Sequence, residues 1–261
     1  MISLTRIRLA AVVLAAAALP LSACHKADSD AGASSGSSDN GAGSLTGAPV
    51  AAVTPPAGKS WSDVVSTTAA GGMVMGNPAA AVKLVEYGSL SCPHCAHFAE
   101  FGFKPLVDKY VDSGKVSYEY RSFAIHGMLD VPLTVLVRCA SPQAFFGLVE
   151  QLYTNQPALM TRAQQADKQV QAASALPPEK RFVALSDAMG FTDFFSARGV
   201  PVDQAHACLA DPANAQRVAK DAQSFSDQGV DSTPTLMING IKTDATSWAE
   251  LEPMLQKAGA R

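Results

Sequence analysis

The chain contains 261 residues, of which 48% are hydrophobic and 16% are charged, a balance typical of a globular protein. Its 20 basic and 23 acidic residues give a formal net charge of −3. Lysine and arginine do not cluster beyond the first few residues, so the composition excludes nucleic acid as an expected partner. Beyond residue 60 there remain about 200 residues, enough for one domain with a full core or for a small domain with an insertion.

Residues 1–23 have the layout of a secretory signal. Two arginines precede an apolar run over residues 9–19, and this run is shorter than the roughly 20 apolar residues that a transmembrane helix needs. The sequence LSAC, which ends at Cys24, resembles the lipobox of bacterial lipoproteins, in which the cysteine is acylated and begins the mature chain. We therefore expect a lipoprotein signal peptide over residues 1–23 and a lipid on Cys24. Ordinary secretion with a spare thiol at Cys24 is the alternative.

Residues 24–60 are expected to form a flexible tether, because they are rich in Ala, Gly, Ser, Asp and Pro and cannot bury enough apolar surface to become ordered. A flexible coil of about 30 residues reaches on the order of 30 Å. The lipid on Cys24 would hold the folded domain at the periplasmic side of a Gram-negative membrane, where disulfides form. His25 is not the aspartate that commonly retains lipoproteins at the inner membrane, so the sequence does not choose between the inner and the outer membrane.

The first elements of the domain read as strands around a helix. A short extra strand is expected within residues 71–78, and residues 81–89 (AVKLVEYGS) read as a buried strand. Apolar residues at helical spacing predict a helix over residues 93–114, with a kink at Pro105. Residues 115–125 read as a second long strand, so this β-α-β order predicts a parallel pair with a right-handed crossover.

Helical signals then continue through residues 126–225, where apolar residues recur at i, i+3 and i+4 between prolines and glycines. We interpret this segment as an inserted helical subdomain. After it, residues 229–240 read as a loop and a strand that ends in an Asn-Gly hairpin turn. A final amphipathic helix is expected over residues 247–257. The predicted domain therefore has two parts, residues 61–125 and 226–261, separated by the insertion.

Two cysteines, Cys92 and Cys95, flank Pro93 and His94 directly after the first long strand. The helix pattern places Cys92 at the N-cap and Pro93 in the first turn, where the missing N–H of proline costs nothing. Free backbone N–H groups and the helix dipole then favour the thiolate of Cys92, and any positive charge on His94 adds to this field. Cys95 lies one turn deeper on the same face, close enough to close a small disulfide ring. The motif therefore predicts a redox-active disulfide.

This Cys-Pro-His-Cys motif and the sequence STPT at residues 232–235 resemble the DsbA-like branch of the thioredoxin superfamily, including its alphaproteobacterial members. The resemblance covers residues 76–257 and includes the position of the helical insertion. It implies an α/β thioredoxin-like fold with an inserted helical subdomain. It also implies that the peptide bond before Pro234 is cis and lies beside the two cysteines, where the backbone of Thr233 is offered to a substrate strand.

Glu86 stands six residues before Cys92, on the first long strand. The resemblance matches it to an acidic residue in the charged group beneath the active site of DsbA-like proteins, which implies proton handling near Cys95. A solvent-facing strand carboxylate is the alternative. A second acidic position of better-studied relatives falls at Ala99, with Glu100 one residue out of register, so their complete proton relay is not matched here.

A second cysteine pair, Cys139 and Cys208, lies within the helical insertion. Both residues could be buried small hydrophobes. The even number of cysteines in an oxidising compartment favours a disulfide, and some alphaproteobacterial DsbA-like proteins carry a second pair in the same subdomain. We therefore expect a structural disulfide Cys139–Cys208, which would contribute on the order of 4 kcal/mol for a loop of about 70 residues in the chain-entropy model.

No metal or organic cofactor is expected. His97 stands near the two redox cysteines, but a zinc site usually needs four ligands and no second Cys-x-x-Cys or His pair stands at a suitable spacing. We interpret His97 as a polar residue on the exposed first turns of a helix. His126 and His206 lack ligand-like companions in the sequence and receive no role.

The resemblance implies an extracytoplasmic thiol:disulfide oxidoreductase that introduces disulfide bonds into exported proteins. Reduced exported proteins are the expected substrates, and a DsbB-like, quinone-linked membrane oxidase is the expected partner that reoxidises the cysteine pair. The membrane is reached through the lipid anchor. The protein is expected to be a monomer.

Three other functions remain as alternatives. A disulfide isomerase or reductase is the nearest one, although such enzymes usually carry an N-terminal dimerisation domain for which the tether has no room. A metal-handling protein would use Cys92, Cys95 and a histidine to deliver copper or zinc. A periplasmic chaperone would bind peptides in the groove beside Pro234 without redox turnover.

Overall fold

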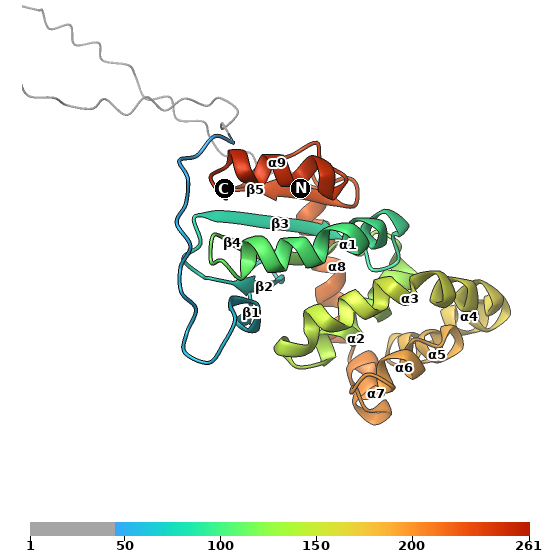
Figure 1. Cartoon of the computed structure of the whole chain (residues 1–261). Helices are drawn as coiled ribbons and strands as arrows, with labels where there is room; N and C mark the ends of the chain where they lie inside the picture. The colour runs from blue at the N-terminus through green and yellow to red at the C-terminus, as the bar shows by residue number, and fades with distance from the viewer. Residues whose placement is uncertain (1–44) are drawn as a thin grey trace, which may run out of the picture. The chain divides into compact units, whose positions relative to one another are not determined.

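The computed structural model describes residues 45–261. The expected signal peptide, the lipid site Cys24 and the first part of the expected tether lie outside these residues. The described part of the chain folds around a mixed sheet with helices on both faces, and a group of helices is inserted between the fourth and fifth strands (Figure 1). This is the predicted α/β architecture with a helical insertion.

The sheet contains six strands in the order β1-β2-β4-β3-β5-β6. Only β3 and β4 run parallel among the strand pairs of the described residues, and the other neighbours are antiparallel. The strands are β1 (Val65–Thr67), β2 (Met73–Gly76), β3 (Val82–Gly88), β4 (Val116–Ser122), β5 (Thr235–Ile238) and β6 (Ile241–Lys242). The two long strands predicted from the sequence are β3 and β4, and they form the expected parallel pair. The edge strand β1 was not expected.

Helix α1 (Pro93–Pro105) connects β3 to β4 and continues as a π-helical segment, Leu106–Val111. Proline has no N–H for the helical ladder, so Pro105 ends the regular α-helix at the residue where a kink was predicted. The C-terminal part of the domain also follows the sequence pattern. Asn239 and Gly240 take positive φ values of 51° and 82° in the hairpin turn between β5 and β6, and α9 (Trp248–Lys257) forms the final helix.

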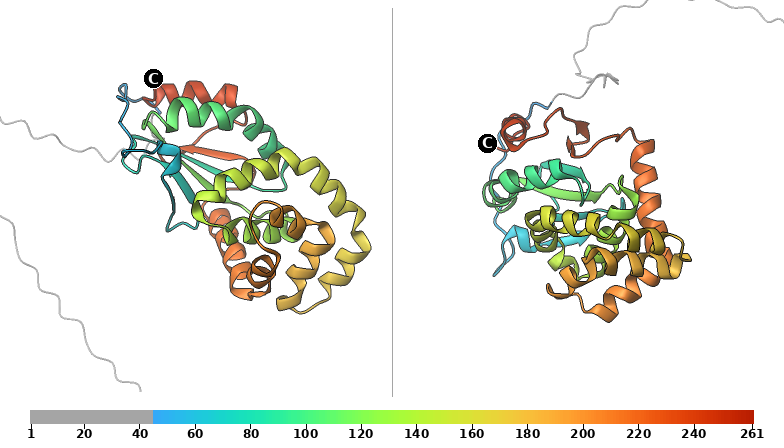
Figure 2. Two further views of the ribbon diagram at one scale, coloured as in Figure 1. Left: turned by 60° about the horizontal axis from the view of Figure 1, so that its bottom comes forward. Right: turned by 90° about the vertical axis from the view of Figure 1, so that its right-hand side faces the viewer.

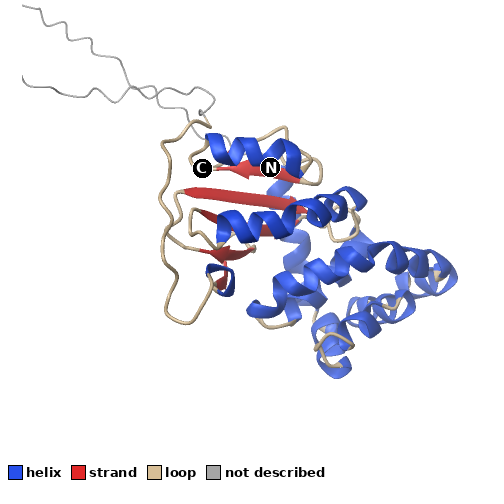
Figure 3. Ribbon diagram, viewed as in Figure 1, coloured by secondary structure: helices blue, strands red, loops and turns tan. Residues whose placement is uncertain are grey.

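Seven helices occupy the region in which a helical insertion was predicted, and Figure 3 shows most of them as a group beside the strands, with α8 behind the sheet. They are α2 (Gly127–Cys139), α3 (Phe145–Gln165), α4 (Asp167–Ser174), α5 (Pro178–Met189), α6 (Phe191–Ser196), α7 (Val202–Ala210) and α8 (Pro212–Asp227). Two 3-10 turns, Trp61–Asp63 and Pro142–Ala144, complete the helical elements. No helix within residues 45–261 is long and apolar enough to cross a membrane.

The two faces of the sheet carry different helices. Helices α1 and α9 lie together on one face, and α8 lies on the other (Figure 2). Successive residues of a strand point to opposite faces, so Tyr87 packs edge-on against Phe225 of α8, with ring centroids 5.0 Å apart. Its neighbour Glu86 points to the opposite face, where it lines a small cavity with Phe98 of α1. The strand therefore directs the carboxyl group of Glu86 towards the helix that carries the two cysteines.

Residues 45–60 differ from the flexible tether that was predicted to continue to residue 60. The backbone N–H of Gly47 donates to Lys257 at 2.9 Å, that of Val50 donates to Gly259 at 2.8 Å, and that of Val53 donates to Ser113 at 2.9 Å. The indole N–H of Trp61 in turn donates to the carbonyl of Val53 at 2.7 Å. Backbone hydrogen bonds do not depend on side-chain type, so a composition poor in large apolar residues does not predict them. This part of the segment lies against the folded domain.

Candidate active site

Cys92 is the N-cap residue of α1, and Pro93 occupies the first helical turn, as predicted. The chain reaches this position through a tight turn in which the N–H of Cys92 donates to the carbonyl of Ser89 at 3.1 Å. Gly88 ends β3 just before the turn, and a β-carbon there would lie 2.5 Å from the ring of Tyr120. The close packing of Tyr120 under Gly88 therefore helps to define where the strand ends and the cysteine turn begins.

Thr233 and Pro234 lie beside the cysteine turn although they are far away in the sequence. The Thr233–Pro234 peptide bond is cis, the isomer that the resemblance implied. The Cys92 sulfur lies 3.5 Å from the carbonyl oxygen of Thr233, to which its thiol donates when protonated. The backbone of Thr233 therefore adjoins the reactive sulfur.

The pKa of the Cys92 thiol is lowered from 9.0 to about 5. The largest cause is a hydrogen bond from the thiol of Cys95, followed by burial, which acts in the opposite direction. The side chain of Thr233 and the backbone N–H groups of Cys95 and His94 add further stabilisation of the thiolate. The backbone N–H groups at the helix start thus act in the predicted direction, but they are smaller causes than the Cys95 thiol, and the part that His94 plays comes through its backbone N–H.

The pKa of the Cys95 thiol shifts in the opposite direction, to well above 9.0. Burial is the main cause, and the hydrogen bond that Cys95 gives to Cys92 and the nearby charge of Glu86 add to it. The Cys95 side chain is fully buried. The pair therefore consists of one sulfur that is stable as a thiolate and one that is stable as a thiol.

Glu86 is buried, with only 2% of its surface exposed, so the solvent-facing alternative is wrong. Tyr118 donates a hydrogen bond to Oε2 of Glu86 at 2.6 Å, while Oε1 has no hydrogen-bond partner among the described residues. Burial raises the pKa of this carboxyl group to about 7, with the Tyr118 bond opposing the shift and the negative charge of Cys92 adding to it. A buried carboxyl group that titrates near neutrality can exchange a proton at physiological pH.

The second acidic position of the better-studied relatives is occupied here by an uncharged residue, Ala99. Ala99 lines the cavity that also contains Glu86, whereas Glu100 is exposed and lies 3.9 Å from the ring of the equally exposed His97. Glu86 is therefore the carboxyl group of this helix–strand pair that is buried near the cysteines.

Sequence reasoning missed a buried polar cluster that holds the cysteine turn. Asp130 of α2 is fully buried and accepts hydrogen bonds from the hydroxyl of Ser89 and from the backbone N–H of Ser91, at 2.9 and 3.0 Å. The hydroxyl of Ser91 lies 3.0 Å from Nδ1 of His126, which gives this histidine a place in the site. The signal that could have identified the cluster is an aspartate within the apolar pattern of α2, because such a residue needs partners when buried.

The family model of thioredoxin matches residues 68–257, which include every element from β2 to α9. The chain belongs to the thioredoxin family. The motifs at Cys92 and Pro234 therefore led to the correct family and fold.

Solved structures agree with this assignment. This thioredoxin-family chain superposes on a protein-disulfide isomerase from Novosphingobium aromaticivorans with a TM-score of 0.67 and 29% identity, over 71% of this chain and 96% of that one. It superposes on Wolbachia pipientis alpha-DsbA1 with a TM-score of 0.55 and 19% identity, over 71% of this chain and 89% of the other. At 19% identity the second likeness concerns the fold alone.

A similar sequence is found in Rickettsia bellii, in a protein described as a candidate protein-disulfide oxidoreductase. The two sequences are 26% identical over 193 residues, which cover 71% of this chain and 64% of that protein. The thioredoxin-family chain therefore spans less than two thirds of the length of this relative.

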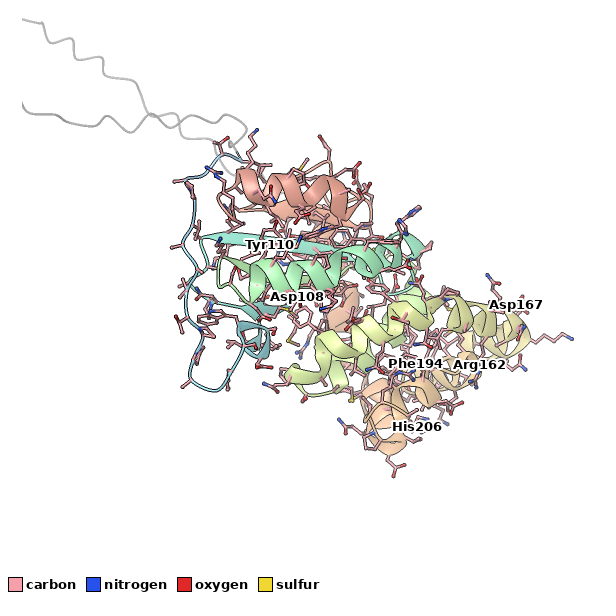
Figure 4. All side chains as sticks on the ribbon, in the orientation of Figure 1. Asp108, Tyr110, Arg162, Asp167, Phe194 and His206 are labelled. Atoms are coloured by element: carbon pink, nitrogen blue, oxygen red, sulfur yellow. A yellow bond between two sulfur atoms is a disulfide. The ribbon has the colours of Figure 1, made fainter. Side chains whose placement is uncertain are left out.

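Cys139 and Cys208 form the predicted disulfide, which joins the end of α2 to α7 across 69 residues of sequence. A loop of this length contributes on the order of 4 kcal/mol in the chain-entropy model. Both residues are partly exposed. The bond lies within the insertion, as does His206 (Figure 4), whose ring lies 2.9 Å from Asp187.

Histidines and cysteines do not gather into a metal site in the described part of this thioredoxin-family protein. Residues 45–261 contain no group of three or more His, Cys, Asp or Glu side chains that could hold a metal ion. His97, the residue that most resembled a ligand in the sequence, instead packs edge-on against Phe101, with ring centroids 4.9 Å apart.

The lowered pKa of Cys92 predicts that the reduced form gains stability over the oxidised form as the pH rises. Below pH 5 both folded and unfolded thiols are protonated, so the contribution vanishes; between about 5 and 9.0 only the folded thiol has lost its proton. The reduced form should therefore gain up to about 1.4 kcal/mol per pH unit in this window. Urea unfolding of both forms across this pH range measures the difference, and thiolate absorbance in the ultraviolet measures the pKa directly.

Glu86 also makes the stability depend on pH, but it affects the oxidised and the reduced form alike. Its raised pKa lowers stability as the pH rises from 4.5 to about 7, but Glu86 is present in both redox forms and largely cancels in their difference. A stability difference that does not change with pH, together with a Cys92 thiol that titrates like free cysteine, would contradict the assignment of Cys92 as the stabilised thiolate.

Proposed function

We propose that this protein is a thiol:disulfide oxidoreductase that introduces disulfide bonds into exported proteins. The observation that supports this most directly is the opposite shift of the two sulfurs, since Cys92 favours the thiolate and Cys95 favours the thiol. Stabilising the thiolate stabilises the reduced pair, so the oxidised pair tends to pass its disulfide on. An oxidant of exported proteins needs this bias.

The reaction begins with the oxidised pair, in which Cys92 and Cys95 share a disulfide. A substrate thiolate attacks the Cys92 sulfur, the bond between the two cysteines breaks, and Cys95 leaves with the bonding electron pair. A second substrate thiolate then attacks the substrate sulfur of the mixed disulfide. This forms the disulfide of the substrate and releases Cys92 as its stable thiolate, so two electrons pass from the substrate to the enzyme.

Two neighbouring groups, the backbone of Thr233 and the carboxyl group of Glu86, assist these steps. The Thr233 backbone, which adjoins the Cys92 sulfur, pairs with the extended substrate and holds its thiol in line for attack. Glu86 gives a proton to Cys95 as that sulfur leaves and takes one back when the pair is reoxidised. The oxidant that restores the pair is a quinone-linked membrane oxidase of the DsbB type.

The comparison with the Novosphingobium aromaticivorans structure, which is described as a protein-disulfide isomerase, favours a second candidate function. An isomerase attacks existing disulfides in substrates with Cys92 in the reduced state, whereas an oxidase starts from the disulfide form. Refolding assays separate the two. An oxidase forms disulfides in a reduced substrate faster than it reshuffles a scrambled one.

The variant Cys95→Ala should accumulate mixed disulfides with substrates, because its Cys92 thiolate still attacks substrate disulfides and no Cys95 thiol remains to reverse that step. The adducts are detected on non-reducing gels after expression in a Gram-negative host, and mass spectrometry identifies the partners. The double variant Cys92→Ala, Cys95→Ala is the control and should form none. If this double variant still replaced the parent in a deletion strain, the chaperone function would hold and the redox function would fail.

The variant Glu86→Gln should slow the oxidation of a reduced peptide by about 100-fold, the lower end of the 10²- to 10⁴-fold that general acid–base catalysis contributes. The pH–rate profile of the parent should contain a step near the pKa of Glu86, about 7, and the variant should lose it. Glu100→Gln, which changes an exposed carboxylate on α1, should keep both the rate and the step. An unchanged profile in Glu86→Gln would remove this residue from the proton path.

We also propose that the protein is held at a periplasmic membrane surface by a lipid on Cys24. The support is the sequence LSAC after an apolar signal segment. The variant Cys24→Ala should lose labelling by radioactive palmitate and should leave the membrane fraction. Ser22→Ala, which keeps a small residue before the cysteine, should remain attached. Cys24→Ala protein that still sediments with membranes and still incorporates palmitate would contradict the anchor.

A further inference from the structure

The turn that carries the reactive cysteine is held by side chains from the helical insertion. Within residues 89–92, the carbonyl of Ser89 accepts a hydrogen bond from Tyr153 at 3.2 Å, and the N–H of Ser91 donates to Asp130 at 3.0 Å. The carbonyls of Leu90 and Cys92 both accept a hydrogen bond from the side chain of Gln156. A buried backbone group without a partner is costly, so these side chains stabilise the conformation of the turn.

Gln156 makes two of these contacts with one nitrogen. Its Nε2 donates to the carbonyl oxygen of Leu90 at 2.9 Å and to that of Cys92 at 3.1 Å. An amide NH₂ group carries two N–H bonds, so each carbonyl receives one of them. The side chain therefore bridges the Leu90–Ser91 and Cys92–Pro93 peptide groups, the second of which starts at the N-cap residue of α1.

The carbonyl of Cys92 links this bridge to the helix that stabilises the thiolate. It accepts the N–H of Ala96 at 3.2 Å, which is the first hydrogen bond of α1. Gln156 thus fixes the same peptide group from which the helix starts. The backbone N–H groups of His94 and Cys95 that act on the Cys92 sulfur follow within the first turn.

The burial of Gln156 separates this role from a role in substrate binding. The residue borders an open groove between α1 and α3, about 480 Å³ in volume, which also contains Pro93, His97 and Glu150. Only 3% of its own surface is exposed. The amide group therefore faces the cysteine turn, and the groove is left to the other side chains.

We propose that Gln156 is a positioning residue for the redox centre, which holds Cys92 at the start of α1 by binding the carbonyls of Leu90 and Cys92. This proposal rests on the redox function proposed above. When the bridge is lost, both carbonyls lose a hydrogen bond, although that of Cys92 keeps the N–H of Ala96, and the Leu90–Ser91 and Cys92–Pro93 peptide groups are held less firmly. The sulfur then leaves its alignment with the donors at the helix end, and the thiolate is stabilised less.

The test is the variant Gln156→Met, which keeps the length of the side chain and removes both donors. The pKa of the Cys92 thiol should rise by about half a unit, equivalent to about a threefold loss of thiolate stabilisation. The equilibrium between the protein and reduced glutathione should shift by a similar factor towards the protein disulfide. Gln156→Glu, whose carboxylate has no N–H to donate, should shift both quantities in the same direction.

Leu159→Ala provides the matched control, because Leu159 is buried on the same helix and makes only apolar contacts. It should lower the stability of the oxidised and reduced forms equally and leave the glutathione equilibrium unchanged. Equal redox shifts in Leu159→Ala and Gln156→Met would overturn the proposal, since loss of packing would then explain both. A Gln156→Met protein with the pKa and equilibrium of the parent would also overturn it.

A measurement on the parent chain does not depend on how well the variants fold. The side-chain amide protons of Gln156, observed by NMR, should exchange slowly with solvent and should change chemical shift between the reduced and oxidised forms. Rapid exchange, or identical shifts in both forms, would overturn the positioning role. If instead the Cys92 thiol of the parent titrates like free cysteine, the proposed redox function itself fails, so the two failures are distinguishable.

Discussion

The chemistry of this protein depends on the unequal environments of two neighbouring sulfurs. Cys92 meets a thiol, a hydroxyl-bearing residue and backbone N–H groups at the start of α1, which lowers its pKa to about 5. Cys95, one helical turn away, is fully buried, and burial, its hydrogen bond to Cys92 and the nearby charge of Glu86 raise its pKa. The hydrogen bond between the two sulfurs strengthens both shifts, because the thiol of one stabilises the thiolate of the other.

Each element around the site contributes to this inequality. Strand β3 buries Glu86 under α1, and Gly88 allows the chain to pass over Tyr120 before it turns. The distant segment at Thr233 and Pro234 brings a carbonyl to the reactive sulfur. The helical insertion supplies Asp130, Tyr153 and Gln156, whose side chains form hydrogen bonds with the backbone of the cysteine turn. The insertion is therefore part of the redox centre and also the cover of the sheet.

Residues that depend on long-range packing were the ones that sequence reasoning misjudged or missed. The sequence left undecided whether Glu86 is buried or exposed, because a single carboxylate on a strand does not show which helix will cover it. Gln156 and Asp130 were not singled out, since their partners are backbone groups about 40 to 65 residues away in the chain. For residues 45–60 the composition predicts a tether, whereas backbone hydrogen bonds, which the composition does not reveal, hold this segment against the domain.

By itself, the sequence was sufficient for the family, the order of the elements, the cysteine at the helix start and the second disulfide. The order of the elements and the cysteine at the helix start follow from local patterns such as apolar periodicity, Pro after Cys and Asn-Gly at a turn. The family followed from the resemblance of the motifs at Cys92 and Pro234, and the second disulfide from that resemblance together with the even number of cysteines. Only the tertiary structure decided that Glu86 is buried, that Cys95 is the main donor to Cys92, and which side chains hold the turn. A pKa and a hydrogen bond depend on which atoms surround a group in space, and a local pattern does not contain that information.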